Sequence, residues 1–116
     1  MSKVILVAED DDDVREFAEM LIGHLGYDVV SAPDGVAALQ VIEERSVDAL
    51  LTDIRMPRMD GYELAARAHK LRPEMPIVCV TGFSHLSADG RHCQVFLRKP
   101  FAPRQLEEVL KQLVPS

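Results

Sequence analysis

Two hydrophobic patterns alternate along the chain. Nearly continuous apolar runs, typical of strands buried on both faces of a parallel sheet, occur at residues 4–8, 29–32, 47–52, 77–81 and 95–98. Between these runs, apolar residues recur at intervals of three and four, which indicates amphipathic helices. The clearest helical set is Val14, Phe17, Ala18, Leu21, Ile22 and Leu25. We therefore predict an α/β fold with a mostly parallel five-stranded sheet.

Residues that start and stop helices support this interpretation. Asp11 or Asp12 can cap the first helix, and Gly26 can end it. Pro103 suits the first turn of the last helix. The pattern is weak in only one place, between the fourth and fifth apolar runs, where Gly90 would disfavour a helix. We expect the fourth of the five helices to be short or irregular.

Length and charge narrow the class of protein. With 116 residues and 28% charged residues, the chain fits one globular domain spanning 1–116. A net charge of −6 argues against nucleic acid as a direct partner. The sequence shows no membrane-spanning stretch and no signal peptide, so we expect a cytoplasmic protein without membrane association. Cys79 and Cys93 lack a metal-binding spacing, and we expect both to be reduced thiols.

Polar residues stand where the apolar runs end. Glu9 and Asp10 follow the first run, Asp53 the third and Lys99 the fifth, while Thr81 closes the fourth. In open α/β sheets the carboxyl ends of the strands form the ligand-binding edge, so these side chains should converge. Clustered carboxylates repel one another unless a cation binds, and Mg²⁺ prefers such oxygen ligands. The set predicts magnesium-assisted phosphoryl transfer with Asp53 as the acceptor.

Each of these residues also has an ordinary structural interpretation. The acidic run 9–13 could be a solvated loop that caps a helix. Asp53 could simply occupy a turn, and Lys99 could be a surface residue. Phe96, within a strand, is by default a core residue. The conjunction of all these residue types at successive strand ends favours the functional interpretation.

Four short motifs carry a family resemblance. They are Val7-Ala8-Glu9-Asp10-Asp11, Asp53 with Met56-Pro57 and Met59-Asp60-Gly61, Thr81-Gly82, and Lys99-Pro100-Phe101. From about residue 3 to residue 113 the chain resembles the CheY-like receiver domains of two-component response regulators. The resemblance implies a flavodoxin-like, doubly wound fold with strand order 2-1-3-4-5 and helices on both faces of the sheet.

The resemblance also implies an activity and a cofactor. Asp53 would take a phosphoryl group from the phosphohistidine of a histidine kinase or a histidine phosphotransfer protein. Asp10 and Asp53 would bind Mg²⁺ directly, Glu9 would act through water, and Arg55 would contribute its backbone carbonyl. Such a module is a signalling phosphoacceptor that catalyses only its own phosphoryl transfer and dephosphorylation, rather than an enzyme acting on other substrates.

Further residues have roles implied by position. Thr81 and Lys99 would contact the phosphoryl group, and Phe96 would be the aromatic that moves with Thr81 on activation. Arg55 and Phe83 would tune the rate of dephosphorylation. Glu9 departs from the family, in which Asp is commoner. The stretch between Thr81 and Lys99 is shorter than usual by roughly one helical turn.

The short stretch bears on signalling. We expect residues 83–94 to be the most mobile part of the domain and to carry, with Phe96, any output signal. The resemblance leaves open whether the domain forms a homodimer on activation, because the short stretch belongs to the face that many receivers use for dimerisation.

Two other functions use a similar fold. A Mg²⁺-dependent phosphohydrolase that forms an aspartyl phosphate usually has a second Asp two residues after the nucleophile, where this chain has Arg55. A flavodoxin-like binding module needs a loop rich in Ser, Thr or Gly after the first strand. The acidic run 9–13 would instead repel a flavin phosphate.

Overall fold

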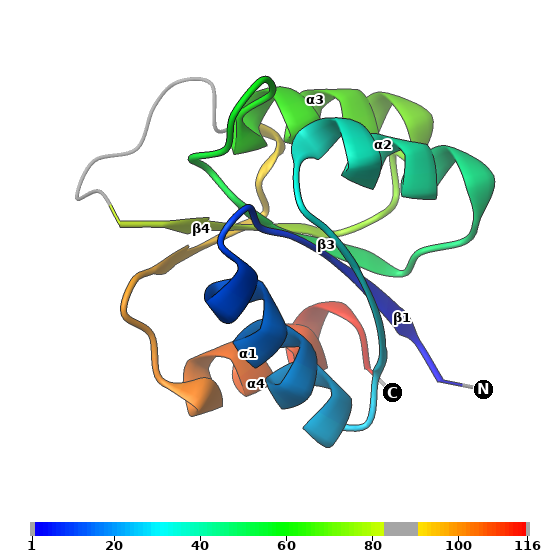
Figure 1. Ribbon diagram of the computed structural model, residues 1–116. Coiled ribbons are helices and arrows are strands. Elements are labelled where there is room, and N and C mark those ends of the chain that lie inside the picture. The colour runs from blue at the N-terminus through cyan, green and yellow to red at the C-terminus, as the bar shows by residue number, and fades with distance from the viewer. Residues whose placement is uncertain (1, 83–90, 116) are drawn as a thin grey trace.

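The computed structural model describes residues 2–82 and 91–115 and has one sheet between two pairs of helices (Figure 1). In chain order the elements are β1 (Val4–Ala8), α1 (Asp12–His24), β2 (Asp28–Ala32), α2 (Gly35–Glu44), β3 (Ala49–Asp53), α3 (Gly61–Leu71), β4 (Ile77–Thr81), β5 (Val95–Arg98) and α4 (Pro103–Leu113). The five strands are parallel and lie in the order β2-β1-β3-β4-β5. The expected fold class and strand order are confirmed.

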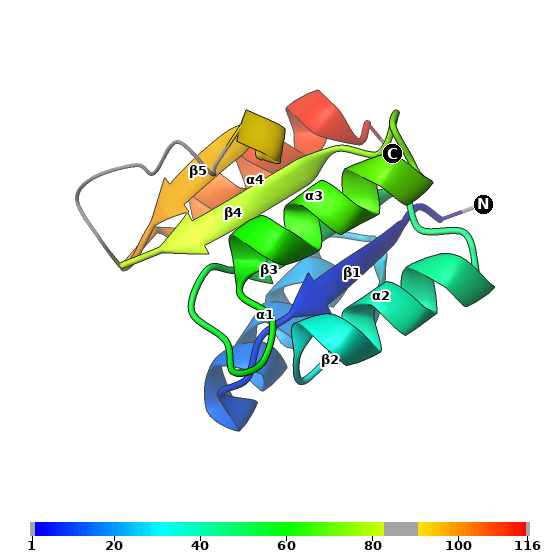
Figure 2. The same cartoon turned by 90° about the horizontal axis from the view of Figure 1, so that it is seen from above.

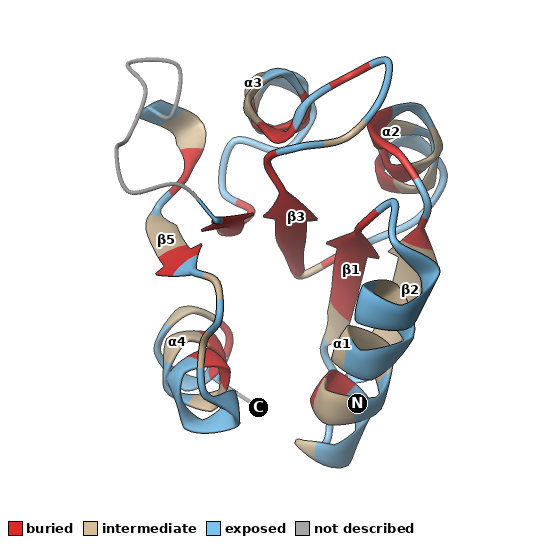
Figure 3. Cartoon of the chain, turned by 60° about the vertical axis from the view of Figure 1, so that its left-hand side comes forward, coloured by how far each residue is buried: buried red, intermediate tan, exposed pale blue. Residues whose placement is uncertain are grey.

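Alternating side chains of the strands build a core on each face of the sheet. In β3, Leu50 joins the cluster under α2 and α3, whereas Leu51 joins the cluster under α1 and α4. Figure 2 shows α2 and α3 side by side over one face of the sheet. Every residue of β3 and β4 is buried, and β1 and β3 form the buried centre in Figure 3. A sheet covered on both faces explains why the strand sequences are continuously apolar.

Aspartate side chains begin three of the helices. Asp11, Asp34 and Asp60 are the N-caps of α1, α2 and α3, and each accepts a hydrogen bond from a backbone N–H of the first turn. Such caps satisfy donors that a helix start would otherwise leave unpaired. The choice of Asp11 over Asp12 is now settled. Gly26 has a φ of 99°, in the left-handed region, so the predicted stop after α1 is confirmed.

The expected irregular helix between β4 and β5 falls mainly on residues 83–90, which lie outside the described residues. The same holds for most of the segment 83–94 that we expect to be mobile. Of the described part, residues 91–92 form a short 3₁₀ turn. Within the described ranges, no helix is long and apolar enough to cross a membrane.

The expectation of two reduced cysteines was wrong. Cys79 and Cys93 form a disulfide, with their Cα atoms 5.8 Å apart. Cys79 points from β4 into the core on the α2/α3 side, and Cys93 lies two residues before β5, the neighbouring strand. The Gln94 backbone N–H donates to the Ile77 carbonyl at 2.9 Å, which brings the start of β5 beside the start of β4. The pairing therefore depends on strand neighbours rather than on a sequence motif.

Candidate functional site

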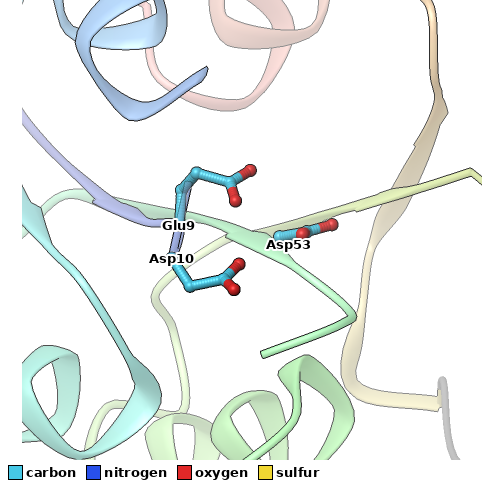
Figure 4. A group of neighbouring side chains, drawn as sticks. All are labelled: Glu9, Asp10 and Asp53. Atoms are coloured by element: carbon cyan, nitrogen blue, oxygen red, sulfur yellow. The ribbon is translucent and has the colours of Figure 1, made fainter. Parts of the chain in front are cut away.

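Three carboxylates meet at the carboxyl edge of the sheet. Asp53 is the last residue of β3, and Glu9 and Asp10 directly follow β1. Because β1 and β3 are parallel neighbours, their ends lie at the same edge. One carboxylate oxygen from each residue lies within 4.8 Å of the other two, and Figure 4 shows the three side chains grouped together. The predicted acidic cluster is therefore formed.

Two of these acids are held in a largely dry environment. Glu9 is 5% exposed and Asp53 is 9% exposed. The Asp11 backbone N–H donates to Glu9 Oε2 at 3.1 Å, and the Ile54 backbone N–H donates to Asp53 Oδ1 at 3.0 Å. Arg15, from α1, donates through Nη1 to the Glu9 carbonyl at 3.0 Å. These contacts fix both carboxylates and the loop between β1 and α1.

Lys99 joins the cluster from the neighbouring strand end. Its Nζ lies 3.4 Å from Glu9 Oε1 and 3.5 Å from Asp53 Oδ1. The Lys99 backbone N–H donates to the Thr81 carbonyl at 2.8 Å, which joins the ends of β4 and β5. Thr81 is itself buried. The structure thus brings the five polar residues that were expected to converge, from four strand ends, to one edge of the sheet.

The acidic cluster carries more negative charge than Lys99 alone can balance. Burial raises the pKa of Glu9 and of Asp53 above their ordinary values. Neighbouring carboxylates add to this, since Asp53 raises the pKa of Glu9 and Asp10 raises that of Asp53, while Lys99 acts in the opposite direction. Lys99 pairs with two of the three acids. An all-oxygen donor set with excess negative charge fits a hard divalent cation such as Mg²⁺.

The other predicted residues are placed less closely. Phe96, in β5, is partly buried and packs against the core on the α2/α3 side, away from the acids at the strand ends. Arg55 is exposed in the loop after β3, where it lines a surface cavity of about 500 Å³ together with Asp10. Phe83 lies outside the described residues. Its predicted role, like the roles given to Arg55 and Phe96, stays a prediction.

Two residues, Arg15 and Gly61, support the site through contacts that the sequence alone does not indicate. Arg15 reaches back six positions to the Glu9 carbonyl, and nothing in the sequence distinguishes it from other arginines on exposed helix faces. Gly61 is part of the motif after Asp53, and its backbone N–H donates to the Ile54 carbonyl at 2.8 Å. Both hold main chain next to the acids.

The family follows from a direct match. The family model of the response regulator receiver domain matches residues 5–111, which include every residue of the acidic cluster and Lys99. The chain belongs to the response regulator receiver family. As a receiver domain it is a phosphoacceptor module of two-component signalling, which is the first of the three functions considered from the sequence.

Relatives of this receiver domain occur alone and within larger proteins. It is 39% identical to the response regulator receiver protein CpdR of Brucella abortus, over 98% of this chain and 99% of that protein. It is 34% identical to the sensor kinase CckA of the same organism, over 97% of this chain but only 13% of CckA. Receiver domains thus work together with histidine kinases, and some are part of them.

A solved structure of similar shape is informative about ligands. The response regulator TrrA of Thermotoga maritima, in complex with Mg²⁺ and BeF, matches with a TM-score of 0.92 and 28% identity, over 97% of this chain and 99% of that one. Receiver domains bind Mg²⁺ in an acidic pocket, and this chain has an acidic cluster of Glu9, Asp10 and Asp53 at the carboxyl edge of its sheet.

Proposed function

We propose that this receiver domain accepts a phosphoryl group on the carboxylate of Asp53 from a phosphohistidine of a histidine kinase or histidine phosphotransfer protein. The observation that carries the proposal is the position of Asp53. It ends a fully buried strand, shares an oxygen cluster with Glu9 and Asp10, and forms an ion pair with Lys99. A rigid acceptor with fixed neighbours suits phosphoryl transfer, which depends mainly on positioning and charge.

The acidic cluster would hold Mg²⁺. Asp10 and Asp53 would be direct ligands, Glu9 would act through a bound water, and the backbone carbonyl of Arg55 would complete the protein ligands. When bound, the ion neutralises the clustered acids and the oxygens of the incoming phosphoryl group. The fit is supported by the convergence of the three carboxylates within 4.8 Å and by the burial of Glu9 and Asp53, which raises the pKa of both side chains because it removes solvent from the charged form.

The residues of the chain divide the remaining work. Asp53 Oδ1 is held by the Ile54 N–H and by Lys99, which leaves Oδ2 to attack phosphorus. A bond from Oδ2 to phosphorus forms as the phosphorus–nitrogen bond of the donor histidine breaks, and the bonding electrons return to that imidazole nitrogen. Lys99 then stabilises the added negative charge, and the Thr81 hydroxyl donates to a phosphoryl oxygen.

The proposal also covers the extent and location of the domain and the residues that tune its response. Residues 1–116 would act as one receiver domain in the cytoplasm, and the net charge of −6 argues against direct binding to nucleic acid. The phosphorylated domain would slowly hydrolyse its own acyl phosphate, at a rate tuned by Arg55 and Phe83. Phe96 would respond to a movement of Thr81 toward the phosphoryl group.

Phosphoryl uptake tests this function. With acetyl phosphate and Mg²⁺, the intact mass of the protein should increase by one phosphoryl group, and hydroxylamine should remove it because it is an acyl phosphate. Asp53→Asn should abolish uptake. Asp28→Asn, which changes an exposed carboxylate at the far end of β2, is the matched control and should leave uptake unchanged. Stoichiometric uptake by Asp53→Asn would refute the assignment.

A further inference from the structure

The Cys79–Cys93 disulfide lies next to Thr81 and Phe96, the two residues to which the proposed function gives the activation response. It joins positions 14 residues apart and closes a loop that contains Thr81. Cys79 is fully buried, and Cys93 is 9% exposed. Both residues are buried, and of the two only Cys93 keeps a small solvent-accessible area.

Two observations connect this disulfide with Phe96 and Thr81. Cys79 is two positions before Thr81 in β4, so the two side chains lie on the same face of the sheet. In the parallel register, Cys79 is directly opposite Phe96, and both belong to the packing on the α2/α3 side. The crosslink thus borders both residues to which the activation response is assigned.

The segment that leads into β5 is also fixed beside the crosslink. Gln94 donates from its backbone N–H to the Ile77 carbonyl at 2.9 Å, and its Oε1 accepts from the Ile77 N–H at 2.6 Å. With Cys93 bonded to Cys79, the start of β5 is held to β4 by a covalent bond and by two hydrogen bonds. Phe96 is only three residues from Cys93 along the chain, so the disulfide limits how far Phe96 can move relative to β4.

We propose that Cys79 and Cys93 form a thiol–disulfide exchange site, and that its oxidation disfavours the phosphorylated conformation of the receiver. The proposal rests on the proposed phosphoacceptor function. The co-reactant is a dithiol, either small or carried by a reducing protein. In the oxidised form the crosslink restrains the Thr81–Phe96 region as it stands in this structure, and in the reduced form the region is free to rearrange.

Reduction of the disulfide by the dithiol takes place in two steps. A thiolate of the dithiol attacks the Cys93 sulfur, the bond between the two protein sulfurs breaks, and Cys79 leaves with the electron pair and takes up a proton. The second thiolate of the reductant then attacks the mixed disulfide and releases Cys93 as a thiol. The protein gains two electrons and two protons, and the dithiol becomes a disulfide.

Redox state and activation are then linked reciprocally. If reduction raises the affinity for a phosphoryl mimic by some factor, the mimic must favour the dithiol over the disulfide by the same factor. Couplings between sites in proteins typically amount to about fivefold or more. The coupling can therefore be measured in two independent ways, from the affinity for the mimic and from the thiol–disulfide equilibrium.

Beryllofluoride with Mg²⁺ is the probe. Its dissociation constant would be measured by NMR titration of the oxidised protein and of the protein reduced with dithiothreitol, with free thiols counted by alkylation and mass spectrometry. The reduced form should bind about fivefold tighter or more. Beryllofluoride should shift the thiol–disulfide equilibrium, measured in mixtures of reduced and oxidised dithiothreitol, by the same factor toward the dithiol.

Several outcomes would overturn the proposal. If the oxidised and reduced forms differ in free-thiol count but bind beryllofluoride with equal affinity, the coupling is excluded. If an oxidant does not form the disulfide and a reductant does not release free thiols in the native protein, exchange at Cys79 and Cys93 is excluded. The variant Cys79→Ala/Cys93→Ala should bind beryllofluoride identically with and without reductant, and Cys93→Ala alone serves if the double variant does not fold. A reductant effect that persists in these variants would also contradict the proposal. If neither redox form binds beryllofluoride, the phosphoacceptor function is refuted, and the coupling with it. The free-thiol counts would still show whether Cys79 and Cys93 exchange with a dithiol.

Discussion

Gly61 packs directly against the main chain of Asp53. A Cβ atom at position 61 would lie 2.3 Å from the Asp53 carbonyl oxygen and 2.8 Å from the Ile54 Cα. Both of these atoms belong to backbone and cannot rotate away, unlike the end of a flexible side chain. The absence of a side chain at the start of α3 therefore lets the helix approach the strand end that carries the proposed acceptor.

Gly61→Ala should disturb the site as well as the fold. Overpacking of this kind typically lowers the free energy of unfolding by about 1–3 kcal/mol, and the displaced Asp53 should bind Mg²⁺ more weakly. Urea unfolding and a Mg²⁺ titration would measure the two effects. Gly23→Ala is the control, because a Cβ there meets nothing within 4 Å. The control should gain roughly 0.5–1 kcal/mol as a helical glycine is replaced. Wild-type behaviour of Gly61→Ala would contradict the packing argument.

Metal affinity should distinguish the roles of the two neighbouring acids. Asp10→Ala removes a proposed direct ligand and its charge, and should weaken Mg²⁺ binding more than the loss of Glu9 does. Glu9→Ala removes a proposed water-mediated contact and should weaken it about tenfold, within the range for the loss of outer-shell partners. Isothermal titration would compare both variants with Asp28→Asn, which should bind as wild type does. Equal affinities throughout would exclude the cluster as the metal site.

Without metal, the contribution of Glu9 and Asp53 to the free energy of unfolding should fall as the pH rises. Burial raises the pKa of Glu9 and Asp53 in the folded state, so folding is favoured most below the ordinary carboxyl pKa of about 4. This contribution disappears as the pH increases through the raised values. Asp53→Asn should therefore be more stable than wild type near neutral pH without metal, and saturating Mg²⁺ should reduce the difference. Urea unfolding across the pH range in a chelator would show this, and a less stable Asp53→Asn would contradict it.

Lys99 should act on the phosphoryl group and not on the metal. Lys99→Ala removes a cation that already pairs with Glu9 and Asp53. The affinity for Mg²⁺ should be unchanged or higher, while uptake from acetyl phosphate should fall. Lys111→Ala, at a surface pair with Glu107 on α4, is the control and should change neither property. Loss of metal binding in Lys99→Ala would be inconsistent with the proposed role.

Much of the fold could be predicted because buried parallel strands leave a strong local pattern. The runs 4–8, 77–81 and 95–98 coincide with β1, β4 and β5. The third run was predicted at 47–52, whereas β3 comprises Ala49–Asp53. Val47 is buried without belonging to the strand, and Asp53 belongs to it although it is charged. Burial and strand pairing are different properties, and hydrophobicity reports only the first.

Much of the site could also be predicted, because its residues stand directly at the ends of the apolar runs. The types of residue at the strand ends indicated the chemistry of Glu9, Asp10, Asp53 and Lys99. Periodicity does not determine which strands are neighbours, so the order of the sheet had to come from the family resemblance. The error at Cys79 and Cys93 came from judging the two cysteines by their spacing, whereas their pairing depends on where Cys93, before β5, lies beside β4. The close approach of Gly61 to Asp53 is likewise a property of packed backbones.

The most direct test of the central claim is to locate the phosphoryl group in the chain. After incubation with acetyl phosphate and Mg²⁺, reduction with borohydride converts a phosphorylated aspartate to homoserine, which peptide mass spectrometry can assign to one position. We expect homoserine at position 53 only, and none when Mg²⁺ is chelated. Homoserine at position 10, modification at Glu9, or phosphoryl uptake that leaves Asp53 unmodified would contradict the account.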